Sequence, residues 1–447
     1  MKHNHHVALA CLSVLLAMTL LSGCTTGDQR NQAEQQPQPI KQEFQLQSHG
    51  GSPNSDAPGR PIPNPPSSSG SVPKTDARPQ QLGRIHPEAG IRSQSEVQQQ
   101  DKATREMQRT DISPPKVPEE VRGIYVSGWV AGGTKAMNKL TRLVEQTDLN
   151  AMVIDVKNDF GQLTYDSMLS DVSKLGADSN PAIKDMPALL DRLKARGIYT
   201  IGRVVVFKDP HLAKKKPEWA FHTKTGALWR DRKGVPWVDP YHPEVRAYNL
   251  AIAEEAARMG FQEIQFDYVR FPDNGAEMDK VVRYHEADGK AKADVIGGFL
   301  RDAKPKLNQA GAVVSADVFG LVTSSRDDLG IGQTWRQVAP SVDVVSPMTY
   351  PSHYSSGMYG IRHPDLQPGK VISRAMQDAV KRNRILEDEG LKPGIVRPWL
   401  QAFTATWVHP HQEYRADEIR QQVLAAKQAG VKQFLLWSSN CKYPYVS

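Results

Sequence analysis

The stretch from 263 to 272 combines the pattern of a buried strand with side chains that could do chemistry. It reads Glu-Ile-Gln-Phe-Asp-Tyr-Val-Arg-Phe-Pro, so an apolar, β-prone run ends with Asp267 and Arg270 among aromatic residues. Burying a charge costs free energy unless the charge is paired, so a purely structural strand has no use for these two residues. Charged residues where a buried strand ends are typical of α/β active sites. This stretch is therefore the first candidate for a catalytic site.

The elements that must position this stretch alternate between strand and helix patterns from residue 121 onward. The expected strands are 123–129, 151–156, 199–207, 263–271, 312–319, 342–348, 395–403 and 433–437. The expected helices are 138–147, 183–196, 243–259, 281–308, 334–338, 370–389 and 416–429. This alternation predicts an α/β fold, a (β/α)8 TIM barrel with parallel strands. Little chain follows the eighth strand, so either the eighth helix is missing or a segment before the first strand covers that flank.

Two carboxylates at the strand ends could cleave a glycosidic bond, since one protonates the leaving oxygen while the other attacks the anomeric carbon or activates water. Asp267 and Asp317 lie on expected neighbouring strands, which are about 4.8 Å apart and could bring the carboxylates close to the roughly 5 Å of a retaining pair. We expect Asp267 to be the nucleophile and Asp317 the acid/base. Asp155 is the main rival for either role. Alternatively, these acids form structural salt bridges with Arg203 or Arg270.

Further polar and aromatic residues at the strand ends suit a carbohydrate, because aromatic faces stack on sugar C–H surfaces and polar groups bond to hydroxyls. The expected substrate-binding residues are Asp155, Lys157, Arg203, Arg270, Tyr350, Gln401, Trp129, Trp399 and Trp437. A long insertion, 208–241, holds five more aromatic residues. These rings either form a wall that stacks on sugars or a small satellite core under the insertion.

Other chemistries have weaker support in the sequence. No glycine-rich phosphate loop follows the first strand, and the motif Gly-x-Ser-x-Gly of serine hydrolases is absent. The late histidines lack the spacing of a strong metal site, and three cysteines are too few for a cysteine-based zinc site. We therefore expect neither a metal nor a cofactor.

The start of the chain is typical of an export signal. Lys2 precedes an apolar run, 7–21, which is too short to span a bilayer, and the sequence Leu-Ser-Gly-Cys then ends at Cys24. This ending resembles a bacterial lipobox, which would make Cys24 a lipidated N-terminus; the alternative is an ordinary signal peptide with a chance cysteine. We expect a lipoprotein signal peptide over 1–23, a disordered tether over 24–115, rich in Gln, Pro, Ser and Gly, and the barrel over 116–447.

The formal net charge of +7 comes from scattered lysines and arginines. For an exported protein this favours affinity for anionic envelope polymers or lipid head groups over nucleic acid. We expect an exported protein that is anchored by lipid at Cys24 to the bacterial membrane or envelope, with a glycan as its partner and no nucleic acid.

Five stretches of the sequence resemble one known family. They are 122–127 (RGIYVS), 153–157 (VIDVK), 237–246 (WVDPYHPEVR), 266–272 (FDYVRFP) and 346–354 (SPMTYPSHY). They are similar to the glycosyl hydrolase-like domain of uncharacterised bacterial lipoproteins and exported proteins. The resemblance covers nearly everything from residue 121 onward and implies a TIM barrel related to the glycosidases.

A comparison with chitinase-type barrels limits the mechanism. Their fourth strand ends in a series of acids with a glutamate donor, where this chain has Arg270, so we do not expect substrate-assisted cleavage of N-acetyl sugars. An acid on the fourth strand and another on the fifth, as in α-amylase-like enzymes, fits better. The sequence thus predicts an envelope-anchored glycoside hydrolase that cleaves a polysaccharide. The alternative is a non-catalytic glycan-binding or envelope scaffold lipoprotein on a degenerate barrel.

Overall fold

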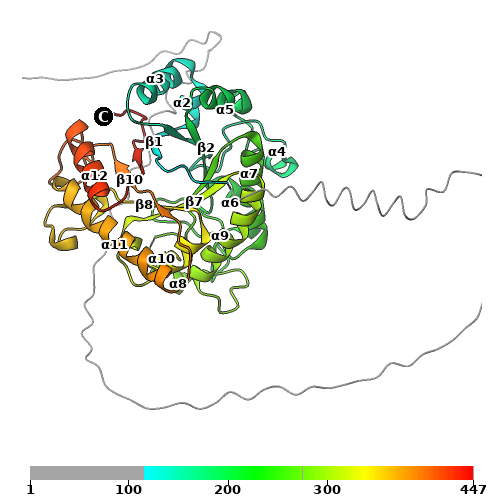
Figure 1. Cartoon of the computed structure of the whole chain (residues 1–447). Helices are drawn as coiled ribbons and strands as arrows, with labels where there is room; N and C mark the ends of the chain where they lie inside the picture. The colour runs from blue at the N-terminus through cyan, green and yellow to red at the C-terminus, as the bar shows by residue number, and fades with distance from the viewer. Residues whose placement is uncertain (1–114, 274, 446–447) are drawn as a thin grey trace, which may run out of the picture. The chain divides into compact units, whose positions relative to one another are not determined.

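A computed structural model describes residues 115–273 and 275–445 of the chain. In this part, parallel strands form a closed barrel with helices around it (Figure 1). Around the barrel the strands are β1 (Arg122–Val126), β2 (Ala151–Lys157), β3 (Tyr199–Val205), β5 (Glu263–Asp267), β7 (Val313–Phe319), β8 (Val344–Met348), β9 (Ile395–Val396) with β10 (Trp399–Gln401), and β11 (Phe434–Trp437). The predicted eight-stranded parallel barrel is confirmed.

Two pairings close the barrel. β11 pairs with β1, and β10 pairs with β8 through Trp399 and Met348. The seventh strand is split into β9 and β10 by Arg397 and Pro398, and a proline cannot donate a ladder hydrogen bond. Both halves pair with β8, so the split bends the strand without opening the barrel.

The helices follow the strands in sequence. They are α2 (Gly128–Gly132), α3 (Thr134–Glu145), α4 (Ser170–Leu175), α5 (Met186–Lys194), α6 (Pro210–Lys215), α7 (Pro243–Met259), α8 (Gly275–Val281), α9 (Lys292–Gln309), α10 (Trp335–Val338), α11 (Pro368–Asp388) and α12 (Ala416–Gln428). Of these helices, none has the length and apolar character needed to cross a bilayer. α7 has the predicted bounds, because proline fits the first helical position and Gly260, with φ of 118°, ends the helix.

Several predicted bounds were wrong, including the following three. The first strand ends at Val126 because Ser127 caps α2, accepting the N–H of Val130 at 3.4 Å. The fourth strand ends at Asp267 because Tyr268 takes a positive φ of 50°. The helix expected over 281–308 begins only at Lys292, after α8 and the short strand β6 (Val282–Arg283).

No helix follows β11 in the described part of the chain, and a C-terminal tail (residues 438–445) covers that flank instead. The hydroxyl of Tyr443 donates to the backbone oxygen of Tyr125 at 2.6 Å, near the end of β1. The hydroxyl of Tyr445 donates to Asp148 at 2.6 Å, and its ring packs on Phe434 at the start of β11. The tail therefore runs back along the outside of the barrel toward the N-terminal ends of the strands.

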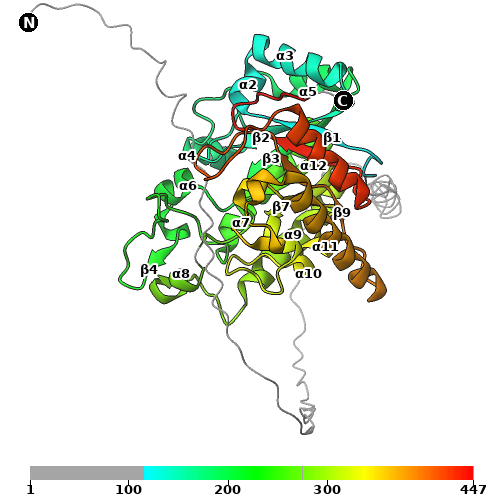
Figure 2. The ribbon, with the colours of Figure 1, turned by 90° about the vertical axis from the view of Figure 1, so that its left-hand side faces the viewer.

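The aromatic residues of the insertion after β3 pack into the main hydrophobic core. The insertion includes the short strand β4 (His222–Thr223), which pairs with β6, and Figure 2 shows β4 and α8 together at one side of the barrel. Phe221, Trp237 and Tyr241 are buried, and the ring of Phe221 contacts Phe271 and Tyr284. These rings thus serve packing, as the second alternative expected, but they extend the main core and do not form a separate one.

The predicted signal segment (1–23), nearly all of the predicted tether (24–115) and the predicted lipidation site Cys24 lie outside the described residues.

Candidate active site

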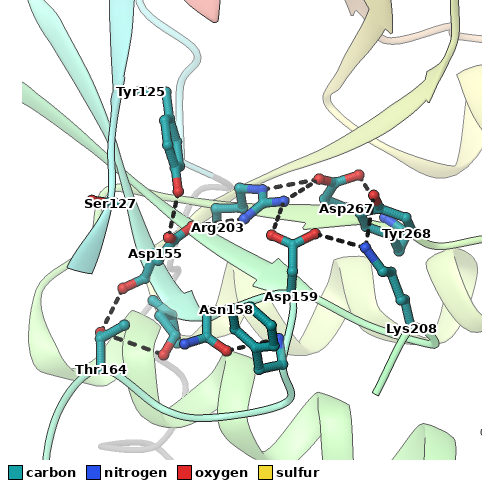
Figure 3. Close-up of polar contacts among 12 residues, drawn as sticks. Tyr125, Ser127, Asp155, Asn158, Asp159, Thr164, Arg203, Lys208, Asp267 and Tyr268 are labelled. Carbon is teal, nitrogen blue, oxygen red and sulfur yellow. Dashed lines mark hydrogen bonds and ion pairs between the residues drawn. The ribbon is translucent and has the colours of Figure 1, made fainter. Parts of the chain in front are cut away.

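Arg203 lies at the centre of a cluster of carboxylates at the C-terminal ends of the strands (Figure 3). Its Nε and Nη2 donate to Oδ2 of Asp267 at 2.9 and 2.6 Å, its Nη1 donates to Asp155 at 2.7 Å, and its Nη2 also reaches Asp159 at 3.2 Å. The sheet order explains this arrangement, because β3 lies between β2 and β5. One guanidinium therefore holds three carboxylates that come from two neighbouring strands and the loop after one of them.

Asp155 is held from two sides. Its Oδ1 accepts from Arg203, and its Oδ2 accepts the hydroxyl of Tyr125 from β1 at 2.7 Å. Burial raises the pKa of Asp155 above its ordinary value, although the charge of Arg203 opposes this effect. Asp155 therefore links Tyr125 of β1 to Arg203 of β3 and helps to orient the guanidinium.

Asp159, Lys208 and Tyr268 form the less buried edge of the cluster. Nζ of Lys208 lies 3.3 Å from Oδ1 of Asp159 and 3.2 Å from the hydroxyl of Tyr268. Burial alone would raise the pKa of Asp159, but the charges of Arg203 and Lys208 lower it to about 2. Asp159 is therefore ionised across the physiological pH range.

Asp267 ends β5 at a strained turn. Tyr268 has a φ of 50°, in a region that is unfavourable for a bulky residue and is often found at functional sites. This conformation directs the N–H of Tyr268 onto Oδ1 of Asp267 at 2.6 Å, while Oδ2 takes the two bonds from Arg203. Both oxygens of this carboxylate are thus held by hydrogen-bond donors.

Asp317 has the opposite surroundings. It lies beside Asp267, since β5 and β7 pair up to Phe266 and Ala316, the residues directly before the two acids. Its Oδ1 accepts the indole N–H of Trp399 at 2.8 Å, and no lysine or arginine of the described chain is in salt-bridge contact with it. Burial, and after it the negative charge of Asp267, raise the pKa of Asp317 well above its ordinary value. Asp317 is therefore suited to carrying a proton.

Aromatic residues pack around both acids. The ring of Trp437 lies 5.3 Å from the guanidinium carbon of Arg203 and packs on Tyr125 and Trp399. Tyr350 lies near the acid pair, since its pKa is raised by burial and by the charges of Asp317 and Asp267. The acids thus share a site with a tyrosine and two tryptophans from β10 and β11.

Four of the expected substrate-binding residues lie outside this cluster. A bulge in β2 after Asp155 turns Lys157 outward, where its Nζ contacts Asp209 at 2.7 Å and Asn249 of α7 at 2.6 Å. Gln401 is buried and bonded to Asp365 and to backbone groups.

The other two of these four residues, Arg270 and Trp129, differ in burial. The guanidinium of Arg270 is buried over the rings of Trp237, Tyr268 and Phe319 and pairs with Asp273. Trp129 is 65% exposed on α2, with no ring contact to another described residue.

Sequence reasoning did not include Tyr125, Lys208 or Tyr268 in the site. It placed Asp159 at the end of the second strand, four residues after Asp155, but gave it no role. Lys208 is the first residue after the expected third strand, but nothing in its sequence context separates it from a solvent-exposed lysine. Within the described residues, no group of histidine, cysteine, aspartate and glutamate side chains has the arrangement of a metal site.

The arrangement combines a carboxylate that is paired with Arg203 and a carboxyl group with a raised pKa on adjacent strands. Such a pair can donate a proton to a leaving oxygen and attack, or activate water against, the carbon beside it. Asp267 and Asp317, the expected catalytic pair, are brought together by the fold.

Comparison with known proteins supports a relation to glycosidases. Residues 123–443 match the model of a family described as "Putative glycosyl hydrolase domain". No curated protein matches the sequence.

Among solved structures, a hypothetical protein from Ruminiclostridium thermocellum is 36% identical, with a TM-score of 0.40; the match covers 46% of this chain and 98% of that one. The PgaB (BpsB) glycoside hydrolase domain from Bordetella bronchiseptica is 15% identical, with a TM-score of 0.52, covering 72% of this chain and 94% of that one. At this identity the second likeness shows the fold alone. Since the family model spans nearly the whole barrel, the chain belongs to the family of this glycosyl hydrolase domain.

Proposed function

We propose that this protein is a glycoside hydrolase that cleaves a polysaccharide of the cell envelope with Asp267 and Asp317. The observation that carries the proposal is the contrast between the two adjacent acids. Asp267 is bound by the cation of Arg203, whereas Asp317 forms no salt bridge within the described residues and has a raised pKa. Pairs of carboxyl groups whose surroundings separate their pKa values are the usual basis of acid/base assignment in glycosidases.

The proposed reaction retains configuration, because the acids lie at equivalent heights on neighbouring paired strands. Asp317 gives its proton to the glycosidic oxygen as the bond between that oxygen and the anomeric carbon breaks. Asp267 forms a covalent bond to the same carbon. In the second half, ionised Asp317 takes a proton from water, and the water oxygen displaces Asp267. Both acids then have their starting protonation states.

Anchoring at Cys24 completes the proposal. The apolar run, the Leu-Ser-Gly-Cys ending and the polar segment that follows it support an exported, lipid-anchored protein. The glycan would then be a polymer within reach of the membrane on which the protein sits.

A second function, glycan binding without cleavage, is favoured by one observation. Arg203 contacts three of the four carboxylates, and Asp267 and Asp317 are both almost fully buried. A salt-bridge network of this kind can be purely structural. The two functions differ in whether a glycan is cut.

Release of reducing ends from a panel of polysaccharides and peptidoglycan distinguishes the two functions. We expect release by the wild type, none by Asp267→Asn, and a rate about 10²- to 10⁴-fold lower for Asp317→Asn. Asp171→Asn is the matched control, because this side chain is exposed on α4 and distant in sequence from both acids. Circular dichroism should show all three variants folded. Binding without release across the panel would support the non-catalytic function, and full activity of Asp267→Asn would refute the assignment.

A further inference from the structure

Trp399, which the sequence analysis expected to bind substrate, forms a hydrogen bond with one of the two candidate acids. Its indole N–H donates to Oδ1 of Asp317 at 2.8 Å, and both residues are nearly inaccessible, with exposed fractions of 1% and 2%. Among the described residues, no other group forms a hydrogen bond with either carboxylate oxygen of Asp317. Oδ1 is therefore committed as an acceptor, and Oδ2 is the oxygen that is available to carry a proton.

We propose that Trp399 is a positioning residue for the general acid: it fixes the carboxyl group of Asp317 so that the proton sits on Oδ2. An indole nitrogen can only donate a hydrogen bond, so a proton on Oδ1 of Asp317 would point at the N–H proton of Trp399. This repulsion favours the proton on Oδ2. The catalytic part of this role rests on the proposed function.

The indole of Trp399 is itself held in place, which a positioning role requires. Its ring meets Trp437 edge to face, with centroids 5.5 Å apart at 88°. Its backbone oxygen accepts from both the N–H and the hydroxyl of Thr349, at 3.1 and 3.0 Å. Because Trp437 also lies against Arg203, which holds Asp267, one stack of rings fixes both acids relative to each other.

The alternative role for Trp399, stacking on a sugar, does not fit its surroundings. A stacking platform needs an open ring face, and this side chain is 1% exposed. Trp437 is less buried and is the better candidate for a sugar contact from this stack.

The bond from Trp399 also acts on the strength of the acid. When Asp317 gives up its proton, the negative charge spreads over both oxygens, and the indole N–H stabilises the share on Oδ1. The bond thus favours the ionised form and lowers the pKa of Asp317 from the high value that burial imposes. Removing the bond should make Asp317 a weaker acid.

The test replaces the N–H with as little other change as possible. Trp399→Phe removes the donor, and 3-benzothienylalanine at position 399 keeps the shape of the indole with sulfur in place of the N–H. Trp335→Phe is a matched control, because Trp335 is also 1% exposed and donates its indole N–H, at 2.8 Å, to Asn383. Should Trp399→Phe fail to fold, the benzothienyl protein still decides the question.

The first measurement needs no substrate. The carbonyl band of protonated Asp317 is isolated by infrared difference spectroscopy against Asp317→Asn and followed as a function of pH. We expect the titration midpoint to move to higher pH in both position-399 proteins and to stay unchanged in Trp335→Phe. An unchanged midpoint in the benzothienyl protein would overturn the proposal.

The second measurement uses a glycan that the wild type cleaves. We expect the position-399 changes to lower kcat about 10- to 100-fold and to leave KM nearly constant. In the pH profile of kcat, the alkaline limb should move to higher pH. A rise in KM with unchanged kcat would overturn the positioning role in favour of substrate contact. If the infrared midpoint moves but no glycan is cut, the positioning of Asp317 stands and the hydrolase proposal fails.

Discussion

Arg203 is the residue on which the candidate site depends most. It is buried and contacts Asp155, Asp159 and Asp267. Its removal would leave Asp155 and Asp267 without their counter-charge and Asp159 with Lys208 alone. A lysine could not replace it, since only the planar guanidinium offers several donors in fixed directions. The same residue holds Asp267, the nucleophile of the proposed reaction, through two hydrogen bonds.

We expect Arg203→Met to lower the free energy of unfolding by about 3–5 kcal/mol near neutral pH, as breaking a buried ion pair does. The loss should be smaller in acid. Asp159, with a pKa lowered to about 2, stabilises the fold above its ordinary pKa, and this contribution disappears as the pH falls toward 2. Urea denaturation at several pH values measures the difference.

Arg196→Met is the control for this experiment. Arg196 pairs with Glu145 on the surface, so its replacement should cost less than about 1 kcal/mol at every pH. Equal losses for the two variants would show that the Arg203 cluster adds nothing to stability.

At the scale of elements, the C-terminal tail (residues 438–445) takes the place of an eighth helix. The sequence indicated that a helix would be missing, but it offered only a segment before the first strand as a substitute. The tail was not predicted because its sequence shows neither the helical nor the strand pattern of apolar residues. Its two contacts with the barrel depend on tyrosine hydroxyls that reach Tyr125 and Asp148, which are distant in sequence.

Truncation of the chain after Ser438 should therefore destabilise the barrel more than loss of the tyrosine hydroxyls alone. We expect the double variant Tyr443→Phe, Tyr445→Phe to cost about 1–3 kcal/mol, the value of two hydrogen bonds. The truncated protein should lose more, because Phe434 and its neighbours become exposed. Thermal unfolding compares the two, and equal melting temperatures would contradict a covering role.

The remaining elements show which parts of the fold can be predicted from sequence patterns. Periodicity and glycine caps predicted the strand count, the order of the helices and both bounds of α7, since these depend on local signals. The end of β5 at Asp267 was missed because it depends on the positive φ of Tyr268. The bulge that turns Lys157 away from the acids was missed because it depends on packing against α7.

At the scale of the whole molecule, the barrel topology brings the candidate acids together. Arg203, Asp155 and Asp267 meet because β3 lies between β2 and β5, and a parallel barrel predicts this order from the sequence alone. Which acid pairs with Arg203 and which forms no salt bridge within the described residues could not be predicted, because both lie at equivalent heights on neighbouring strands in similar sequence contexts. Side-chain surroundings, and above all Trp399, make the difference.

The proposed anchor is tested on the full chain in a bacterial cell. Cys24→Ser should abolish incorporation of labelled fatty acid and move the protein from the membrane fraction to the soluble exported fraction. Cys11→Ser, within the predicted signal, should change neither result. Unchanged membrane attachment of Cys24→Ser would refute lipidation at this residue.

The path of the C-terminal tail affects how the barrel can be attached to a surface. Residues just before β1 lie at the N-terminal ends of the strands, where Gln433 donates to the backbone oxygens of Pro118 and Glu119. The tail returns to the same end, where Tyr445 meets Asp148 and Phe434. Immobilising the barrel on a bead through either of these ends would thus leave the opposite end of the barrel, which holds Asp267 and Asp317, facing the solution.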